Sequence, residues 1–147
     1  MGVTYSDAEA GTAIPPKSYQ VTRLDLVKYC GASGDFNVIH WNERIARSVG
    51  LPGVIAHGMY TMAQGGKFLT AWAGGDPGAV VEYGVRFSSM VPVPDDADPG
   101  SATGGATIEF SGTVAEKLGD NKVAVDVVAR CGGEKVLTRA RAVVRLP

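Results

Sequence analysis

The spacing of apolar residues changes about halfway along the chain, from a helical period to a strand period. The longest helical segment runs from about Ala56 to Ala73 and contains no proline. Its apolar stripe at helical spacing comprises Met59, Met62, Ala63, Gly66, Leu69 and Ala73. Phe68 and Trp72 add apolar side chains outside that stripe. The pattern therefore predicts a core helix that is buried on more than one side.

Two shorter helices are predicted before the core helix. Thr22 and Asp25 form a capping-box pattern ahead of an apolar face that ends at Gly31. Asn42 can cap a second short helix, which we expect at the surface. Between these helices, residues 31–41 mix glycine, serine, aspartate and asparagine with large apolar side chains. That composition is typical of a loop that carries a site.

The second half of the chain alternates apolar and polar residues, the pattern of strands with one buried face. The predicted strands span residues 81–87, 107–115, 123–127 and 136–146. The short connections at 119–121 and 132–134 predict an antiparallel meander of the last three strands. The segment 92–100, rich in proline and aspartate, is predicted to be a surface loop.

One buried helix and a mostly antiparallel sheet define an α+β class, with the sheet covering the helix. A length of 147 residues suits a single domain over residues 1–147. The core helix contains Gly58, Gly65 and Gly66, which predicts close backbone approach of the sheet. Arg139 and Arg141 alternate with alanines on the last strand, and we favour a solvated face over a binding stripe for these arginines and Arg145.

Composition excludes several classes of protein. Hydrophobic residues make up 45% of the chain and charged residues 20%, which is ordinary for a globular protein. The net charge of -1, with no basic cluster, argues against nucleic-acid binding. No apolar run is long enough to span a membrane, and residues 1–19 lack the pattern of a signal peptide, so we expect a cytoplasmic protein. Cys30 and Cys131 have no ligand-type companions at short spacing, so we expect buried thiols, no metal and no organic cofactor.

The chain has 2 histidines, and His40 lies in the polar loop with Asp35 and Asn37. A carboxylate beside an imidazole suits proton transfer, because the carboxylate can orient the ring and tune its pKa. The spacing alone also allows a structural interpretation, in which Asp35 caps a turn and His40 packs against Trp41.

His57 and Gly58 lie where the core helix is predicted to begin. The first N–H groups of a helix have no intrahelical partner and suit a developing oxyanion, and glycine lets a ligand approach them. The His57 side chain can support this site, or it can simply cap or pack the start of the helix.

The segment from Tyr29 to Trp41, followed by Ala56-His57-Gly58-Met59, resembles the MaoC-like or hydratase 2 family. The D-x-N-x-x-H spacing within it is similar to the hydratase motif of that family. The likeness extends from about Ala13 to the end of the chain, and it is greatest to the catalytic subunits of actinobacterial (3R)-hydroxyacyl-ACP dehydratases. Two departures are Val38, where many relatives have proline, and Asp95-Asp96, where a Gly-Asp is common.

The resemblance implies a hot-dog fold, an antiparallel sheet wrapped around a long central helix. It implies reversible dehydration of (3R)-hydroxyacyl thioesters to trans-2-enoyl thioesters on acyl carrier protein, in type II fatty-acid synthesis. An (R)-specific enoyl-CoA hydratase is the main alternative, and a hot-dog thioesterase or a non-catalytic partner subunit is less favoured. The resemblance further implies a homodimer or a heterodimer with a related hot-dog subunit.

The resemblance also assigns roles to individual residues. It implies that Asp35 and His40 are catalytic, with either one as base and the other as acid. It places Asn37, Gly58 and Thr61 on the substrate side: Gly58 N–H would bind the thioester oxygen, Asn37 would order the loop and Thr61 would line the acyl site.

Overall fold

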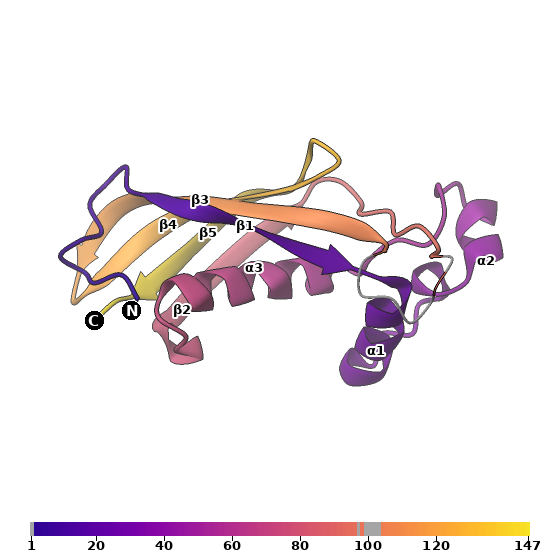
Figure 1. The fold of residues 1–147 in the computed structure, drawn as a ribbon, viewed down its shortest axis with the longest axis horizontal. Coiled ribbons are helices and arrows are strands. Elements are labelled where there is room, and N and C mark those ends of the chain that lie inside the picture. The colour runs from indigo at the N-terminus through magenta and orange to yellow at the C-terminus, as the bar shows by residue number, and fades with distance from the viewer. Residues whose placement is uncertain (1, 97, 99–103) are drawn as a thin grey trace.

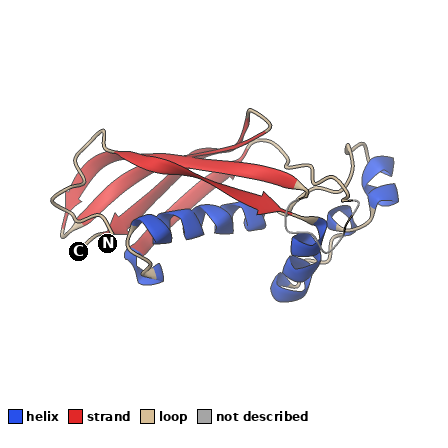
Figure 2. Ribbon diagram, viewed as in Figure 1, coloured by secondary structure: helices blue, strands red, loops and turns tan. Residues whose placement is uncertain are grey.

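One long helix, α3 (Gly58–Trp72), lies along one face of a five-stranded antiparallel sheet in the computed structural model (Figure 1 and Figure 2). The strands are β1 (Ala13–Val21), β2 (Val80–Phe87), β3 (Ala106–Gly119), β4 (Lys122–Cys131) and β5 (Glu134–Arg145). The other helical segments are α1 (Arg23–Ser33), α2 (Glu43–Ser48) and the 3₁₀ turns η1 (Val38–His40) and η2 (Pro77–Ala79). The structure describes residues 2–96, 98 and 104–147.

The strand order is β1-β3-β4-β5-β2, so β1 and β2 form the two edges of the sheet. Every neighbouring pair is antiparallel, and β3, β4 and β5 form the predicted meander. The α+β class and the hot-dog arrangement are therefore confirmed. The apolar positions of β5, Ala140, Ala142 and Val144, are buried, and Arg139, Arg141 and Arg145 are exposed as expected.

Strand β1 was not predicted from the sequence. It contains Pro15 and Pro16, which lack an N–H for the sheet ladder and normally argue against a strand. Because β1 is an edge strand, it tolerates them: its register against β3 shifts between Ile14 and Lys17, on either side of the two prolines. An edge position with an irregular register is where proline is compatible with a sheet.

The core helix begins and ends close to prediction, and the predicted buried stripe is right only in part: Leu69 and Ala73 are buried, whereas Met59, Met62, Ala63 and Gly66 are not. The face turned to the sheet consists of Thr61, Gly65, Phe68 and Leu69, whereas Met59 is 57% exposed and Ala63 is exposed. The apolar stripe and the buried face differ because the sheet packs against the side of the helix that carries Gly65, where a glycine lets a neighbouring element approach closely. A Cβ on Gly65 would collide with the Tyr83 hydroxyl, which explains this glycine as expected.

One helix boundary and the burial of two residues also differ from the sequence predictions. Helix α1 continues through Gly31 to Ser33 and ends at Gly34, whose φ of 76° is the left-handed conformation that favours glycine at a helix end. Helix α2 is not wholly at the surface, because Ala46 is fully buried. In the segment 92–100, Val93 is buried rather than at the surface, and residues 97, 99 and 100 lie outside the described residues.

The α1 and α2 helices lie beyond one end of the sheet, near the start of α3 (Figure 1). Glu43 joins their segments: its carboxylate accepts hydrogen bonds from Arg23 at 2.6 Å, Arg47 at 2.9 Å and the Val54 N–H at 3.2 Å. The Val54 N–H is the largest cause that lowers the pKa of Glu43, and Arg23 adds to it. The carboxylate thus holds α1, α2 and the segment before α3 together, with the loop that carries Asp35 between them. The two predicted helix caps, Thr22 with Asp25 and Asn42, are present.

The two cysteines are free, with Cys30 buried and Cys131 half-buried. Among the described residues, no helix is long and apolar enough to cross a membrane.

Candidate active site

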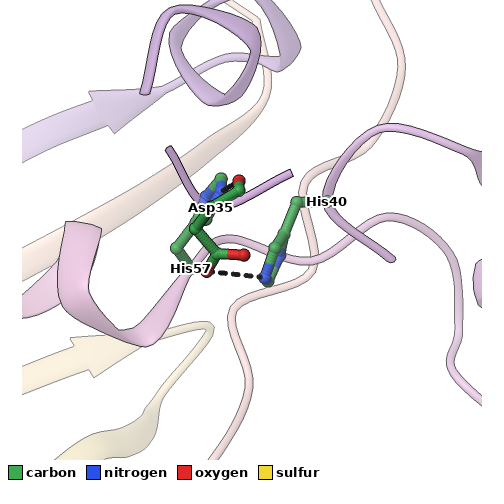
Figure 3. A group of neighbouring side chains, drawn as sticks. All are labelled: Asp35, His40 and His57. Atoms are coloured by element: carbon green, nitrogen blue, oxygen red, sulfur yellow. Dashed lines mark hydrogen bonds and ion pairs between the residues drawn. The ribbon is translucent and has the colours of Figure 1, made fainter. Parts of the chain in front are cut away.

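Asp35, His40 and His57 come together from three segments near the start of α3 (Figure 3). Asp35 follows the end of α1, His40 ends η1, and His57 is the residue immediately before α3. One ligand-type atom from each side chain lies within 4.8 Å of the others. The fold therefore brings together the proposed catalytic pair and the supporting histidine.

The surroundings of His40 determine which ring nitrogen carries its proton. The Nδ1 of His40 lies 2.7 Å from the carbonyl oxygen of Ile55, which can only accept, so Nδ1–H is the donor. In the neutral ring Nε2 then holds a lone pair, and it lies 4.0 Å from Oδ2 of Asp35. His40 is 7% exposed, so its ring is fixed by its surroundings. This arrangement presents a basic nitrogen to the carboxylate and to the adjoining pocket.

The two oxygens of Asp35 have different roles. Oδ1 accepts a hydrogen bond from the N–H of Asn37 at 3.1 Å, so Asp35 does cap a turn. Oδ2 faces His40, and its separation of 4.0 Å from Nε2 is too long for a direct hydrogen bond. A single water or hydroxyl oxygen about 2.8 Å from each atom would bridge them. Asn37 in turn accepts from the Ile39 N–H through its side-chain oxygen, which orders the loop between Asp35 and His40.

His57 is packed against both members of the pair. Its ring stacks on that of His40, with centroids 3.8 Å apart and planes 23° apart. Its Nε2–H donates to the backbone carbonyl of Asp35 at 3.2 Å, and the Cys30 sulfur lies 3.5 Å from the same nitrogen. Its side chain makes no hydrogen bond that caps α3, and its buried Nδ1 has no partner in the described part of the chain. The capping role is therefore wrong, while packing and support of the site both agree with the structure.

Burial is the main cause that lowers the pKa of His57, and the neighbouring His40 lowers it further. The hydrogen bond to the Asp35 carbonyl acts in the opposite direction but is the smaller effect. His57 is therefore held neutral. Burial also raises the pKa of the Cys30 thiol, so this cysteine is a poor nucleophile.

One carboxylate and two imidazoles are also groups that commonly bind metal ions. A metal ion must lie in the plane of each ligating imidazole, along its nitrogen lone pair. The nearly parallel stacking of His40 and His57 keeps these directions side by side rather than convergent. The arrangement suits proton transfer better than metal binding.

A pocket of about 440 Å³ opens beside His40. Gly58 and Thr61 of α3 line it, together with Phe87 of β2 and Leu137 of β5, whereas Asp35 and Asn37 are not among the lining residues. Gly58 opens the first turn of α3, where backbone N–H groups have no intrahelical acceptor. A Cβ on Gly58 would lie 3.1 Å from the Phe87 ring, so a larger side chain would compete with the space at the helix start.

Sequence reasoning missed two parts of this site. The Ile55 carbonyl that fixes the His40 tautomer is a backbone group, and no sequence signal identifies it. Phe87 was assigned only to a strand, although its position near the end of that strand, before the serines of the pocket rim, was a usable signal.

Comparison with known proteins identifies related sequences. Residues 7–124 match the sequence pattern of a family described as "MaoC like domain". The chain is 37% identical over 86 residues to "3-hydroxyacyl-thioester dehydratase X" of Mycobacterium tuberculosis, a match that covers 57% of this chain and 29% of the relative. It is also 42% identical over 66 residues to a fatty acid synthase subunit beta of Schizosaccharomyces pombe, covering 43% of this chain and 3% of that protein.

Solved structures share the fold. A MaoC-like dehydratase superposes with a TM-score of 0.87 at 41% identity, over 99% of this chain and 43% of that one. The R-hydratase PhaJ1 from Pseudomonas aeruginosa superposes with a TM-score of 0.77 at 22% identity, over 99% of this chain and 86% of that one. The chain thus matches 29% of the length of the mycobacterial relative and less than half of that of the solved dehydratase.

Proposed function

The chain belongs to the MaoC-like domain family, and on that premise we propose that it catalyses the reversible dehydration of (3R)-hydroxyacyl thioesters to trans-2-enoyl thioesters. The observation that carries this proposal is the geometry of His40. Its Nε2 lone pair faces Asp35 across a gap of 4.0 Å, beside a pocket that begins at a helix start. The family relative named as a 3-hydroxyacyl-thioester dehydratase supports the same reaction.

In the dehydration direction, His40 acts as the base. Its Nδ1–H bond to the Ile55 carbonyl leaves Nε2 free to accept the proton from Cα of the substrate. The imidazolium that forms lies beside the Asp35 carboxylate, which stabilises the positive charge. The proton then passes from Nε2 to the departing hydroxyl, which leaves as water.

Asp35 holds that hydroxyl in place. An oxygen that bridges Oδ2 of Asp35 and Nε2 of His40 lies within reach of both the carboxylate and the protonated imidazole. In the hydration direction the same position holds the attacking water, whose proton goes to His40 and is returned to Cα. One proton is carried in each direction, so the two residues complete the reaction without a cofactor.

The start of α3 stabilises the negative charge that develops on the thioester oxygen. The Gly58 N–H lies at the positive end of the helix dipole and borders the pocket that contains His40. Thr61, one turn further along α3 and 3% exposed, lines the same pocket and would contact the acyl chain. His57 supports both catalytic residues through its ring and its Nε2–H.

We further propose acyl carrier protein as the carrier and type II fatty-acid synthesis in the cytoplasm as the setting. The relatives named for fatty acid synthesis support this choice. An (R)-specific enoyl-CoA hydratase would perform the same chemistry on a different carrier. Comparing kcat/KM for one enoyl group on CoA and on carrier protein separates the two: at least tenfold preference for the protein-bound substrate supports the proposal, and equal rates contradict it.

A second hot-dog unit is proposed to cover the outer edge of β2, either another copy of this chain or a related subunit. Among the residues that the structure describes, β2 pairs with β5 alone, and no strand covers its other edge. Exposed apolar side chains lie on or near it: Met59, Val81, Phe87 and Met90. Light scattering during size-exclusion chromatography is expected to give twice the chain mass if the chain forms a homodimer. If the partner is a related subunit, the mass is expected to double only after that subunit is added. A fully active monomer at micromolar concentration would contradict this.

The proposed reaction is tested by following the ultraviolet absorbance of trans-2-butenoyl-CoA with the purified chain. Hydration removes the conjugated double bond and lowers the absorbance without releasing a thiol. A thioesterase would instead release free CoA, which a thiol reagent detects. Loss of absorbance with formation of (3R)-hydroxybutanoyl-CoA supports the proposal, whereas thiol release with the double bond intact would overturn it.

A further inference from the structure

The pocket beside His40 lies between α3 and the ends of β2 and β5. On α3 it is lined by Gly58 and Thr61, which share one face of the helix. On the sheet it is lined by Phe87 and Leu137, which are register partners in the β2–β5 ladder. An acyl chain whose thioester oxygen meets the Gly58 N–H therefore enters the space between the helix and these strands.

Tyr83 of β2 packs against α3 one turn beyond Thr61, and it is not among the residues that line the pocket. The side chains of residues 83, 85 and 87 point to the same side of β2. Helix α3 runs antiparallel to this strand, because Phe87 contacts the helix at Gly58 and Tyr83 contacts it at Gly65. The Tyr83 hydroxyl lies so close to Gly65 that no side chain fits there, and its ring is 3.9 Å from the Cβ position of Gly66.

The Tyr83 hydroxyl is buried and has no hydrogen-bond partner within residues 2–96, 98 and 104–147. A buried hydroxyl without a partner is unfavourable for folding, so the hydroxyl itself does not stabilise this position. The part of Tyr83 that matters for the pocket is therefore the bulk of its ring, which occupies the space along α3. The face from Gly58 through Thr61 to Gly65 would otherwise continue as a path lined by small residues.

We propose that Tyr83 closes the acyl end of this pocket and limits the substrates to short and medium acyl chains. This inference rests on the proposed dehydratase function. Gly58 and Gly65 are separated by seven residues of helix, which is about 10 Å at 1.5 Å per residue. At roughly 1.3 Å per carbon of an extended chain, that distance holds about eight carbons.

The test compares kcat/KM for hydration of trans-2-enoyl-CoA substrates with 4, 6, 8 and 12 carbons. Wild type is expected to favour the 6-carbon over the 12-carbon substrate by about tenfold or more. Tyr83→Val is expected to raise the ratio of 12-carbon to 6-carbon kcat/KM at least tenfold, since each further buried methylene contributes roughly fourfold. Tyr83→Phe keeps the ring and is expected to leave the ratio unchanged.

Tyr19→Val is the matched control. Tyr19 is also buried with an unpartnered hydroxyl, packs edge-on against Phe110, and lies on β1 at the opposite edge of the sheet. It should leave the chain-length ratio unchanged. A ratio that shifts equally in Tyr19→Val and Tyr83→Val would show general loosening and overturn the inference, as would wild-type activity on the 12-carbon substrate equal to that on the 6-carbon one.

Two further measurements keep the outcome decisive. If Tyr83→Val fails to fold, Tyr83→Leu replaces it with the same expected direction. Calorimetric binding of saturated hexanoyl-CoA and dodecanoyl-CoA tests the pocket without turnover: Tyr83→Val should bind dodecanoyl-CoA at least tenfold more tightly than wild type. If wild type binds both thioesters but hydrates no substrate, the proposed function is refuted. The pocket inference is then decided by the binding measurements alone.

Discussion

Replacing His57 with phenylalanine is predicted to reduce turnover without destabilising the fold by more than about 0.5 kcal/mol. The substitution keeps an aromatic ring that can stack on His40, whose centroid lies 3.8 Å away. It removes the Nε2–H that donates to the Asp35 carbonyl at 3.2 Å. It also removes the Nδ1 atom, which is buried without a partner.

The two losses act on stability in opposite directions. Losing one hydrogen bond to a carbonyl in an exposed residue costs about 0.5–1.5 kcal/mol, because water can replace the donor. Removing an unpaired buried nitrogen recovers about 1–3 kcal/mol. The net change in the free energy of unfolding is therefore expected to lie between a decrease of about 0.5 and an increase of about 2.5 kcal/mol, so an increase is favoured.

Turnover responds to position rather than to stability. Without the Nε2–H bond, the Asp35 backbone loses its tie to the start of α3, and a displacement of about 1 Å in a catalytic group can cost on the order of a hundredfold. We expect kcat for butenoyl-CoA hydration to fall about ten- to a hundredfold with little change in KM. His57→Gln, which retains an N–H donor but not the ring, separates the hydrogen bond from the stacking.

The same variant has a predicted pH signature. Because burial lowers the pKa of His57, the unfolded chain binds a proton here more readily than the folded one. The contribution of neutral His57 to stability is fully present above the pKa of a histidine in the unfolded chain, about 6.5. It is lost as the pH falls through the pKa of His57 in the folded chain, by at most about 1.4 kcal/mol per pH unit. In urea unfolding between pH 4 and pH 8, the free energy of unfolding of His57→Phe should fall less steeply on acidification than that of wild type. A kcat within twofold of wild type, or a stability loss above about 3 kcal/mol, would refute this account of His57.

Three further substitutions have expected outcomes. Gly58→Val should lower kcat/KM tenfold or more, because the new side chain would crowd the helix start and the Phe87 ring, which lies 3.1 Å from the Cβ position. Unchanged steady-state kinetics would place the oxyanion site elsewhere. Tyr83→Phe should raise the free energy of unfolding by about 1 kcal/mol in urea titrations, since it removes a buried unpaired hydroxyl. A decrease in the free energy of unfolding would show that the hydroxyl has a partner. Glu43→Gln should lower stability by about 1 kcal/mol at pH 7, a modest value because the carboxylate is partly exposed. Because the Val54 N–H lowers the pKa of Glu43 from its ordinary value of 4.5, this stability difference should be lost as the pH falls from that value through the lowered pKa of the folded state. A stability difference independent of pH would contradict this account.

The elements with a strong local pattern were predictable from sequence. The alternation along β5 identified its buried alanines, and the caps at Thr22 and Asn42 identified the starts of α1 and α2. Strand β1 was not predictable in this way, because Pro15 and Pro16 are acceptable only at a sheet edge, and edge position is a property of the tertiary fold.

The candidate site was predictable in its residues but not in its geometry. The spacing of Asp35 and His40 and the family resemblance indicated the pair, and the structure places Oδ2 and Nε2 4.0 Å apart. The His40 tautomer depends on the Ile55 carbonyl, and the stacked position of His57 depends on how α3 meets the loop. Backbone acceptors and the packing between distant segments leave no mark on a local sequence pattern.

The central claim is that Asp35 and His40 together carry the proton and hold the water. It is tested most directly by measuring kcat for trans-2-butenoyl-CoA hydration in Asp35→Asn and in His40→Ala, with circular dichroism to confirm that both remain folded. Each variant is expected to lose at least about a hundredfold in kcat, the usual contribution of a positioned acid or base. A folded variant of either kind that retained near-native kcat would contradict the account.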